Sequence, residues 1–169
     1  MAIRRTAKMG NPVLRGRSEE VPVDLIKSPD VQSLVRDLVE TMREYQGVGL
    51  AAPQVHESLR IFVAEIPQEA ELKIVINPLI SPLSEDTIST WEGCLSIPRI
   101  RGLVRRSSSV KVSGFDQNGN PLQFEAKNFL SAVVQHEADH LDGILFIDRM
   151  DDLQNLCFVE EYVRYHHKS

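Results

Sequence analysis

Cysteine is scarce in this sequence, which has only Cys94 and Cys157 among its 169 residues. Two cysteines cannot build the disulfide framework that stabilises small secreted proteins. A reducing compartment is therefore the simplest interpretation. We expect a cytoplasm-like compartment, or an organelle if a transit peptide has been removed. Both thiols are then available as metal ligands or as small buried side chains.

Long apolar runs and surplus positive charge are missing as well. Arg4 and Arg5 lie near the N-terminus, but polar residues and Gly10-Asn11-Pro12 follow them, so we expect neither a signal peptide nor a membrane span. The formal net charge is -5, and no basic block offsets it. This balance argues against a general nucleic-acid or membrane binder.

The composition that is present, 42% hydrophobic and 25% charged residues, is that of an ordinary globular protein. The length suits one compact domain with a substantial core. There is no internal repeat, low-complexity tract or linker, so residues 1–169 are predicted to form a single domain.

Apolar residues at helical spacing predict a first helix. Ser28 is expected as its N-cap and Pro29 as its first residue, with Gly47 and Gly49 ending it. The predicted buried face consists of Val31, Leu34, Val35, Leu38, Val39 and Met42.

Two further helices are predicted nearer the C-terminus. One begins with Asn128 as its N-cap, runs through His140 and stops at Gly143. The other begins near Asp151 and places Cys157 on its apolar stripe, as a small buried side chain. The other members of that stripe are Leu153, Leu156 and Val163.

A period of two, with β-branched residues, predicts strands over 61–64, 73–76 and 110–114. Asn118-Gly119 lies between Val112 and Phe124 and predicts a hairpin turn. Because helices and strands are both expected in one domain, the fold class is predicted to be α+β.

The sharpest chemical signal is His-Glu-Ala-Asp-His, which begins at His136. Residues four apart share a helix face, so His136 and His140 can reach one metal ion. Glu137 can take a proton from water without binding the metal. Phe129 and Val133 share the histidine stripe, which turns both imidazoles toward the core. Unpaired buried histidines are costly, so a ligand role explains them better than an ordinary helix surface does.

A catalytic site of this kind needs a third protein ligand, and the sequence offers two candidates. Glu160 has the spacing found in thermolysin-like metalloproteases, but Glu161-Tyr162 follows it where that family has Ser-Asp. Cys94 lies upstream, and its thiolate would be a strong ligand for zinc or ferrous iron. Gly93 beside it allows close backbone approach.

Polar residues flank the histidines on the same helix. A metal-binding histidine usually donates its second N–H to a carboxylate or carbonyl group. Gln135, Asp139 and Asp142 are the neighbours on this helix, and the sequence does not say which of them, if any, serves. Asp139 is interpreted as a solvent-facing charge.

Three segments taken together carry a family resemblance. They are Gly47-Val48-Gly49-Leu50-Ala51-Ala52-Pro53-Gln54, Glu92-Gly93-Cys94-Leu95-Ser96, and Gln135-His136-Glu137-Ala138-Asp139-His140-Leu141-Asp142-Gly143. In this order they resemble the three signature motifs of the peptide deformylases. The similarity extends from residues 9–15 to about 146–148. It implies antiparallel sheets packed around a central metal-binding helix.

The resemblance also implies roles for individual residues. Cys94, His136 and His140 would hold the metal, and Glu137 would move the proton during release of formate from N-terminal formylmethionine. The Gln54 side-chain amide and the Leu95 backbone N–H would bind the oxyanion.

Substrate contacts follow from the same resemblance. The backbone of Val48 and Gly49 would pair with an extended peptide. Gly93 and Arg101 would lie beside the substrate. The methionine pocket would be formed by Val48, Leu95, Ala132, Val133 and His136.

The metal and the partners are expected by resemblance alone. Ferrous iron is favoured in the cell, with Zn²⁺, Ni²⁺ or Co²⁺ able to take the same ligands in a purified sample. The partners would be N-formylmethionyl peptides and nascent chains, with at most transient contact with the ribosome. The short C-terminal segment mixes acidic and basic residues, which argues against tight docking there.

Overall fold

Helix α1 (Pro29–Glu44) follows the predicted pattern in a computed structural model that describes residues 2–66 and 71–167. The Ser28 hydroxyl accepts a hydrogen bond from the Val31 N–H, Pro29 is the first helical residue, and every residue of the predicted apolar face is buried. The helix ends before the glycines, because Gln46 takes the left-handed conformation with φ 54°.

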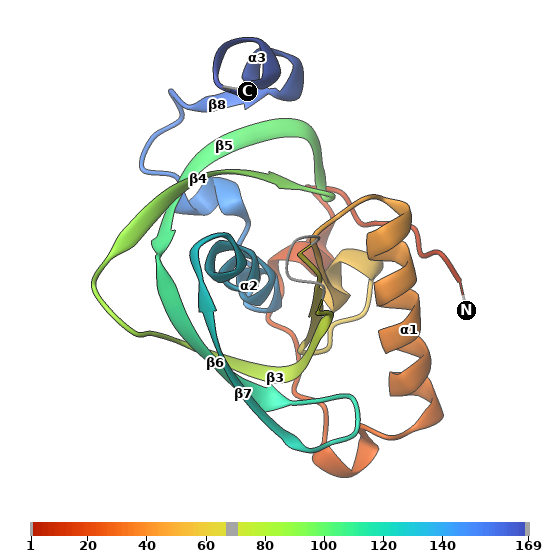
Figure 1. Ribbon diagram of the computed structural model, residues 1–169. Coiled ribbons are helices and arrows are strands. Elements are labelled where there is room, and N and C mark those ends of the chain that lie inside the picture. The colour runs from red at the N-terminus through yellow and green to blue at the C-terminus, as the bar shows by residue number, and fades with distance from the viewer. Residues whose placement is uncertain (1, 67–70, 168–169) are drawn as a thin grey trace.

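The strands of the described residues form two antiparallel sheets (Figure 1). One sheet has the order β1-β2-β3-β6-β7. Its strands are β1 (Gly49–Ala51), β2 (Ile61–Ala64), β3 (Lys73–Pro82), β6 (Ser109–Phe115) and β7 (Pro121–Lys127). The other has the order β4-β5-β8 and consists of β4 (Thr87–Cys94), β5 (Ile97–Ser107) and β8 (Leu156–Phe158).

The predicted strands are therefore confirmed, although β3 is longer than expected. The hairpin at Asn118-Gly119 joins β6 to β7, and Gly119 has φ 77°, a conformation that favours glycine. The hairpin β4–β5 was not predicted from the sequence. Its turn contains Leu95 and Ser96, with Cys94 paired to Ile97 across it.

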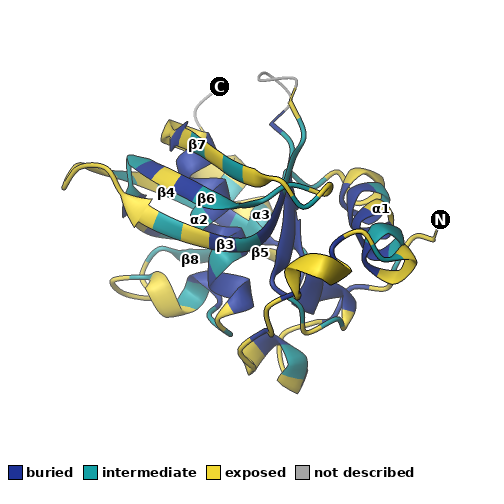
Figure 2. Ribbon diagram, turned by 90° about the horizontal axis from the view of Figure 1, so that it is seen from below, coloured by how far each residue is buried: buried dark blue, intermediate teal, exposed yellow. Residues whose placement is uncertain are grey.

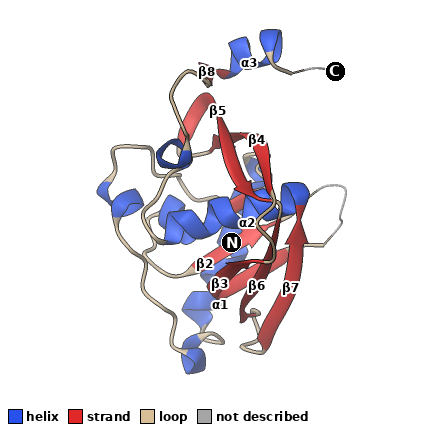
Figure 3. Ribbon diagram, turned by 90° about the vertical axis from the view of Figure 1, so that its left-hand side faces the viewer, coloured by secondary structure: helices blue, strands red, loops and turns tan. Residues whose placement is uncertain are grey.

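Helix α2 (Asn128–Leu141) runs between the two sheets, as Figures 1 and 3 show. Its apolar residues join a core cluster with the five-stranded sheet, to which Phe62, Val75 and Val112 contribute. Buried residues gather on the inner faces of the helices and strands (Figure 2). The α+β fold with antiparallel sheets around a central helix is confirmed.

The remaining elements are short. They are the 3-10 helices η1 (Pro12–Arg15), η2 (Val23–Leu25), η3 (Ala52–Val55) and η4 (Phe146–Arg149), and helix α3 (Val159–Tyr165). Among the helices of the described residues, none is long and apolar enough to cross a membrane.

One N-cap and one helix start were predicted wrongly. Asn128 is not an N-cap but the first residue of α2, with φ 51° and its N–H bonded to the Ser108 carbonyl. The last helix does not begin near Asp151, because Leu156–Phe158 pairs with β5 as strand β8 and α3 starts only at Val159. Cys157 consequently lies half-buried in a strand, not on an apolar helix stripe.

Candidate active site

Helix α2 places His136 and His140 one turn apart, as predicted. Both side chains are buried, and their ring centroids lie 4.9 Å apart in an edge-to-face arrangement. Phe129, expected on the same buried stripe, is instead 48% exposed at the start of the helix. Burial of the histidine stripe therefore begins one turn later, where the helix enters the space between the sheets.

Cys94, the last residue of β4, meets the two histidines. The Cys94 Sγ lies 3.3 Å from His140 Nε2, and the ligand atoms of Cys94, His136 and His140 all lie within 4.8 Å of one another. One thiolate and two imidazoles are the donors that zinc and ferrous iron accept. Both the spacing and the chemistry of the donor set therefore fit a single divalent metal ion.

The surroundings of Cys94 favour its deprotonated form, the thiolate. Burial alone would raise its pKa, but the charge of His140 and hydrogen bonds from both histidines lower the pKa well below the usual range. The Ser96 N–H and the Gln54 Nε2 group also donate to the sulfur, each over 3.4 Å. A deprotonated thiol is the form that binds metals.

Glu92 holds the ring of His136 and was missed in the sequence. Its Oε2 lies 2.8 Å from His136 Nδ1, which leaves Nε2 for the metal position. Burial opposes ionisation of Glu92, but hydrogen bonds and charges from His136 and Arg106 outweigh it and lower its pKa to about 2. Glu92 faces the site because it lies two residues before Cys94 on the same strand.

A buried network of charges supports Glu92 from behind. Arg106 on β5 donates to both Glu92 oxygens over 2.8 and 3.0 Å and to Asp139 over 2.5 Å, and Arg149 also bonds Asp139. The interpretation of Asp139 as a solvent-facing charge was wrong, since only 8% of this residue is exposed. Burial alone would lower the pKa of Arg106, but its pairing with Glu92 and Asp139 outweighs burial. The pKa of Arg106 is therefore raised above its usual value.

The other flanking polar residues do not reach the histidines. Gln135 bonds the Ser107 carbonyl and Ser131, and Asp142 pairs with Arg60. Both anchor α2 rather than orient a ligand.

Glu137 is buried beside the metal cluster, and its Oε2 has no hydrogen-bond partner in the described residues. Burial raises the pKa of Glu137 in the chain alone to about 7, against the lowering effect of the two histidines. A carboxylate that changes protonation near neutral pH suits proton transfer. Gly49 on β1 makes room for it, because a Cβ there would lie 2.4 Å from Glu137 Oε1.

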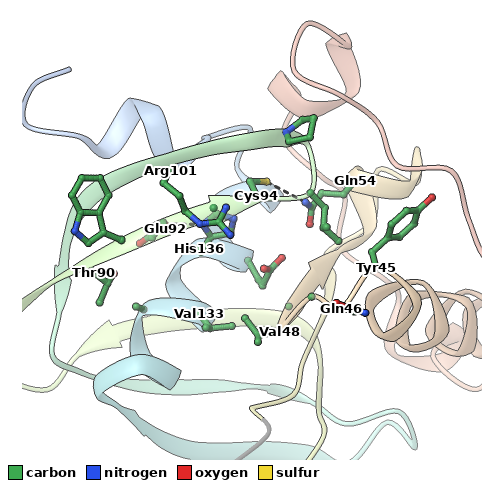
Figure 4. Close-up of a pocket in the computed structure, with 18 of the residues that line it drawn as sticks. Tyr45, Gln46, Val48, Gln54, Thr90, Glu92, Cys94, Arg101, Val133 and His136 are labelled. Atoms are coloured by element: carbon green, nitrogen blue, oxygen red, sulfur yellow. Dashed lines mark hydrogen bonds and ion pairs between the residues drawn. The ribbon is translucent and has the colours of Figure 1, made fainter. Parts of the chain in front are cut away.

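Gln54, in η3, presents its amide nitrogen to the site. Its Oε1 accepts a hydrogen bond from the Ala51 N–H over 2.9 Å, which fixes the orientation of the amide. Its Nε2 points at Cys94 Sγ (Figure 4) and also donates to Ser96 Oγ over 3.3 Å. Leu95 follows Cys94 in the β4–β5 turn and lines the same cleft as Gln54.

These groups open onto a cleft of about 640 Å³ (Figure 4). The residues assigned to substrate by resemblance all line it: Val48, Gly49, Gly93, Leu95, Arg101, Ala132 and Val133. Val48 from the β1 end and Val133 from α2 lie together on one side (Figure 4). His140 lies behind the cleft, 1% exposed.

Glu160, the alternative third ligand, does not belong to this cluster. It is half-exposed on α3 and forms an ion pair with Arg99. Because the third donor near the two histidines is Cys94, the thermolysin-like arrangement is not supported.

The fold and the site together define a metal-dependent hydrolase in which the two histidines of the donor set share one helix with a buried glutamate. The sequence model of the family described as "Polypeptide deformylase" matches residues 3–156. The chain belongs to the polypeptide deformylase family.

Curated relatives agree with this assignment. The chain is 46% identical over 153 residues to peptide deformylase 1 of Corynebacterium glutamicum, covering 89% of each protein. It is 39% identical over 174 residues to the peptide deformylase of Leptospira biflexa, covering 95% of each.

Solved structures show the same fold. A class I type b peptide deformylase from Acinetobacter baumannii superposes with a TM-score of 0.85 at 36% identity, covering 88% of this chain and 100% of that one. The enzyme from Thermotoga maritima gives 0.83 at 37% identity, covering 90% and 100%. The Acinetobacter protein has also been solved with Met-Ala-Ser bound, with a TM-score of 0.83, 34% identity, and coverage of 88% and 99%.

Proposed function

We propose that this protein hydrolyses the formyl amide of N-terminal formylmethionine on newly made polypeptides, releasing formate and a free amine. The observation that carries the proposal is a buried Cys94-His136-His140 donor set beside a buried Glu137 oxygen that no described residue satisfies. The Met-Ala-Ser bound to the Acinetobacter relative supports a peptide substrate.

Cys94, His136 and His140 would hold the metal, which when bound supplies Lewis-acid chemistry. Glu137 accepts the proton of the attacking water and delivers it to the departing amine nitrogen. The Gln54 amide, oriented by the Ala51 N–H, donates to the oxyanion together with the Leu95 N–H. The C–N bond breaks, and the formyl carbon leaves as formate.

The cleft gives the methionine an apolar place beside the metal cluster. Val48, Leu95, Ala132 and Val133 line this part of it. The peptide backbone would pair with Gly49, the first residue of β1, and with Val48 just before it. A formyl group carries a hydrogen where acetyl carries a methyl, so a tight wall beside His136 would exclude acetylated chains.

The test is release of formate from formyl-Met-Ala-Ser by the metal-loaded protein. Cys94→Ala should lose metal and activity together, whereas Glu137→Ala should keep the metal and lose turnover. Cys157→Ala is the matched control, because this half-buried cysteine lies in β8 outside the donor set. Full activity of Cys94→Ala, or no formate from the loaded wild type, contradicts the proposal.

Ferrous iron is the proposed metal in the cell, with zinc, nickel and cobalt as ions that the same donors accept. Anaerobic purification with elemental analysis, and activity expressed per metal ion, tests this choice. A zinc-loaded protein as active as the iron-loaded one would remove the reason for preferring iron.

The place and partners of the reaction follow from the substrate. Because the proposed substrates are nascent formylated chains, we expect the protein to act in the bacterial cytoplasm or in an organelle. We expect only transient contact with the ribosome. The described part of α3 carries Glu160, Glu161 and Arg164, which is not a basic surface. Salt-sensitive co-sedimentation with ribosomes would overturn the expectation of weak contact.

A further inference from the structure

Among the residues that the structure describes, the charged side chains that line the cleft away from the metal cluster are all basic. Lys8, Arg99 and Arg101 line it, and the carboxylates among the lining residues are Glu92 and Glu137, both buried at the metal cluster. The chain as a whole has a net charge of -5. The sign at the cleft is therefore opposite to that of the molecule.

Two of these cations are held by neutral groups. Lys8 Nζ donates to the Leu95 carbonyl and to the Thr6 hydroxyl, each over 2.7 Å. Arg101 donates to the Ile100 carbonyl, and its guanidinium covers Gly93, where a Cβ would lie 1.8 Å from Nη1. Within residues 2–66 and 71–167, neither cation is within ion-pair distance of a carboxylate. Their charge is left for a ligand.

Arg99 is held differently. It has φ 64°, a left-handed conformation that is costly for a side chain other than glycine, asparagine or aspartate, yet it lies at the start of β5 on the cleft. Its guanidinium is 74% exposed and pairs with Glu160 of α3. The Glu160 carboxylate already pairs with the Arg99 guanidinium. Because the Glu160 side chain is half-exposed, a carboxylate of the substrate can displace it.

We propose that the cleft selects formylated peptides that carry aspartate or glutamate among the residues after formylmethionine. This rests on the proposed deformylase function and names its preferred substrate class. An extended peptide advances about 3.3 Å per residue, so the side chains just beyond the methionine come within reach of the cationic rim formed by Lys8, Arg99 and Arg101. Glu160 competes with the substrate for Arg99.

The experiment uses the metal-loaded protein and formyl-Met-Ala-Ala-Ala with glutamate, glutamine or lysine at the second, third or fourth position. At one position or more, kcat/KM should fall in the order glutamate, glutamine, lysine, by about two- to fivefold per step, the size expected for exposed charge pairs. Added salt should reduce the differences in kcat/KM among the three peptides, because it screens exposed charges. Equal rates for the three side chains at every position, or a lysine preference, overturn the inference.

Variants locate the source of the preference. Arg99→Asn keeps a residue that tolerates positive φ and should reduce the glutamate-to-glutamine ratio, as should Lys8→Met. Glu160→Gln should increase that ratio by freeing Arg99. Arg105→Gln is the matched control on the same strand, because Arg105 is also exposed and paired, with Asp151, but does not line the cleft.

The outcomes separate the two proposals. A glutamate-to-glutamine ratio that is unchanged in both Arg99→Asn and Lys8→Met overturns the assignment to the rim while leaving deformylation intact. Failure to release formate from any of the peptides, neutral ones included, contradicts the proposed function itself.

Discussion

At the scale of single residues, Glu92 is the group that orients a metal-binding histidine. It holds His136 Nδ1 on one side and Arg106 on the other. Glu92→Gln should weaken metal affinity about 10- to 100-fold, because the imidazole loses the carboxylate that fixes its orientation and basicity. Chelator competition measures the change.

Glu125→Gln is the control for that substitution, since Glu125 is exposed on β7 and pairs only with Lys127. An affinity for metal in Glu92→Gln equal to that of the control would show that His136 needs no partner.

Asp139 is the residue whose role differs most from its interpretation in the sequence. It is buried between Arg106 and Arg149 and bonds both. Asp139→Ala should lower the free energy of unfolding by about 1.5–3 kcal/mol, because the buried Arg106 guanidinium keeps Glu92 but loses its charged hydrogen bond to Asp139. Urea unfolding measures this. Asp151→Ala, which removes an exposed pair with Arg105, should cost about 1 kcal/mol or less, and equal losses would contradict the network.

At the scale of elements, strand β1 and helix α2 approach each other at Gly49. A Cβ there would lie 2.4 Å from Glu137 Oε1 and 2.8 Å from its Cγ. Gly49→Ala should therefore push the carboxylate out of place and lower kcat about 10²-fold while the metal stays bound, since a misplacement of about 1 Å has that effect.

Gly16→Ala is the control for Gly49→Ala, because a Cβ at Gly16 meets nothing within 4 Å. Metal content and kcat are measured on both variants. Unchanged kcat in Gly49→Ala would mean that Glu137 does not need its present position, and loss of the metal would mean that the whole cluster had shifted.

At the scale of the whole molecule, the N-terminal segment is tied to α1 through Asp37. The Asp37 carboxylate accepts hydrogen bonds from Arg4 and from the Ala2 N–H, over 2.8 and 2.9 Å. Burial would raise its pKa, but these hydrogen bonds and the charge of Arg4 lower it below the ordinary 3.8. A lowered pKa stabilises the folded state above pH 3.8, and that stabilisation is lost as the pH falls through the folded-state value.

Asp37→Asn should accordingly reduce the free energy of unfolding at pH 7 by about 1–2 kcal/mol. The difference from the wild type should shrink as the pH falls below 3.8. Urea unfolding at several pH values checks this, with exposed Glu20→Gln as the control. A difference that stayed constant with pH would show that ionisation of Asp37 is not what matters.

Features encoded within a few residues could be predicted from the sequence. Three such features are the Ser28-Pro29 helix start, the β6–β7 turn at Gly119 and the histidine spacing on α2. Each depends on local geometry, so it can be recognised without knowledge of the fold. Cys94 was a candidate on its chemistry, but only its motif, taken with the others by resemblance, favoured it over Glu160.

Features that join distant segments were decided by the tertiary structure. Glu92 could not be assigned to His136, nor Asp139 to Arg106, because these contacts depend on how β4 and β5 pair and where α2 passes between the sheets. The last helix was predicted too long for the same reason.

The sequence by itself determined the helix that carries the two histidines and Glu137. The spacing of these residues is local, and the chemistry of their side chains follows from residue type. Only the tertiary structure decided what surrounds them. It brought Cys94 to the histidines, buried Glu92 behind His136, and turned Lys8, Arg99 and Arg101 toward one cleft. The physical reason is that strand pairing and burial act between segments that are far apart in the chain.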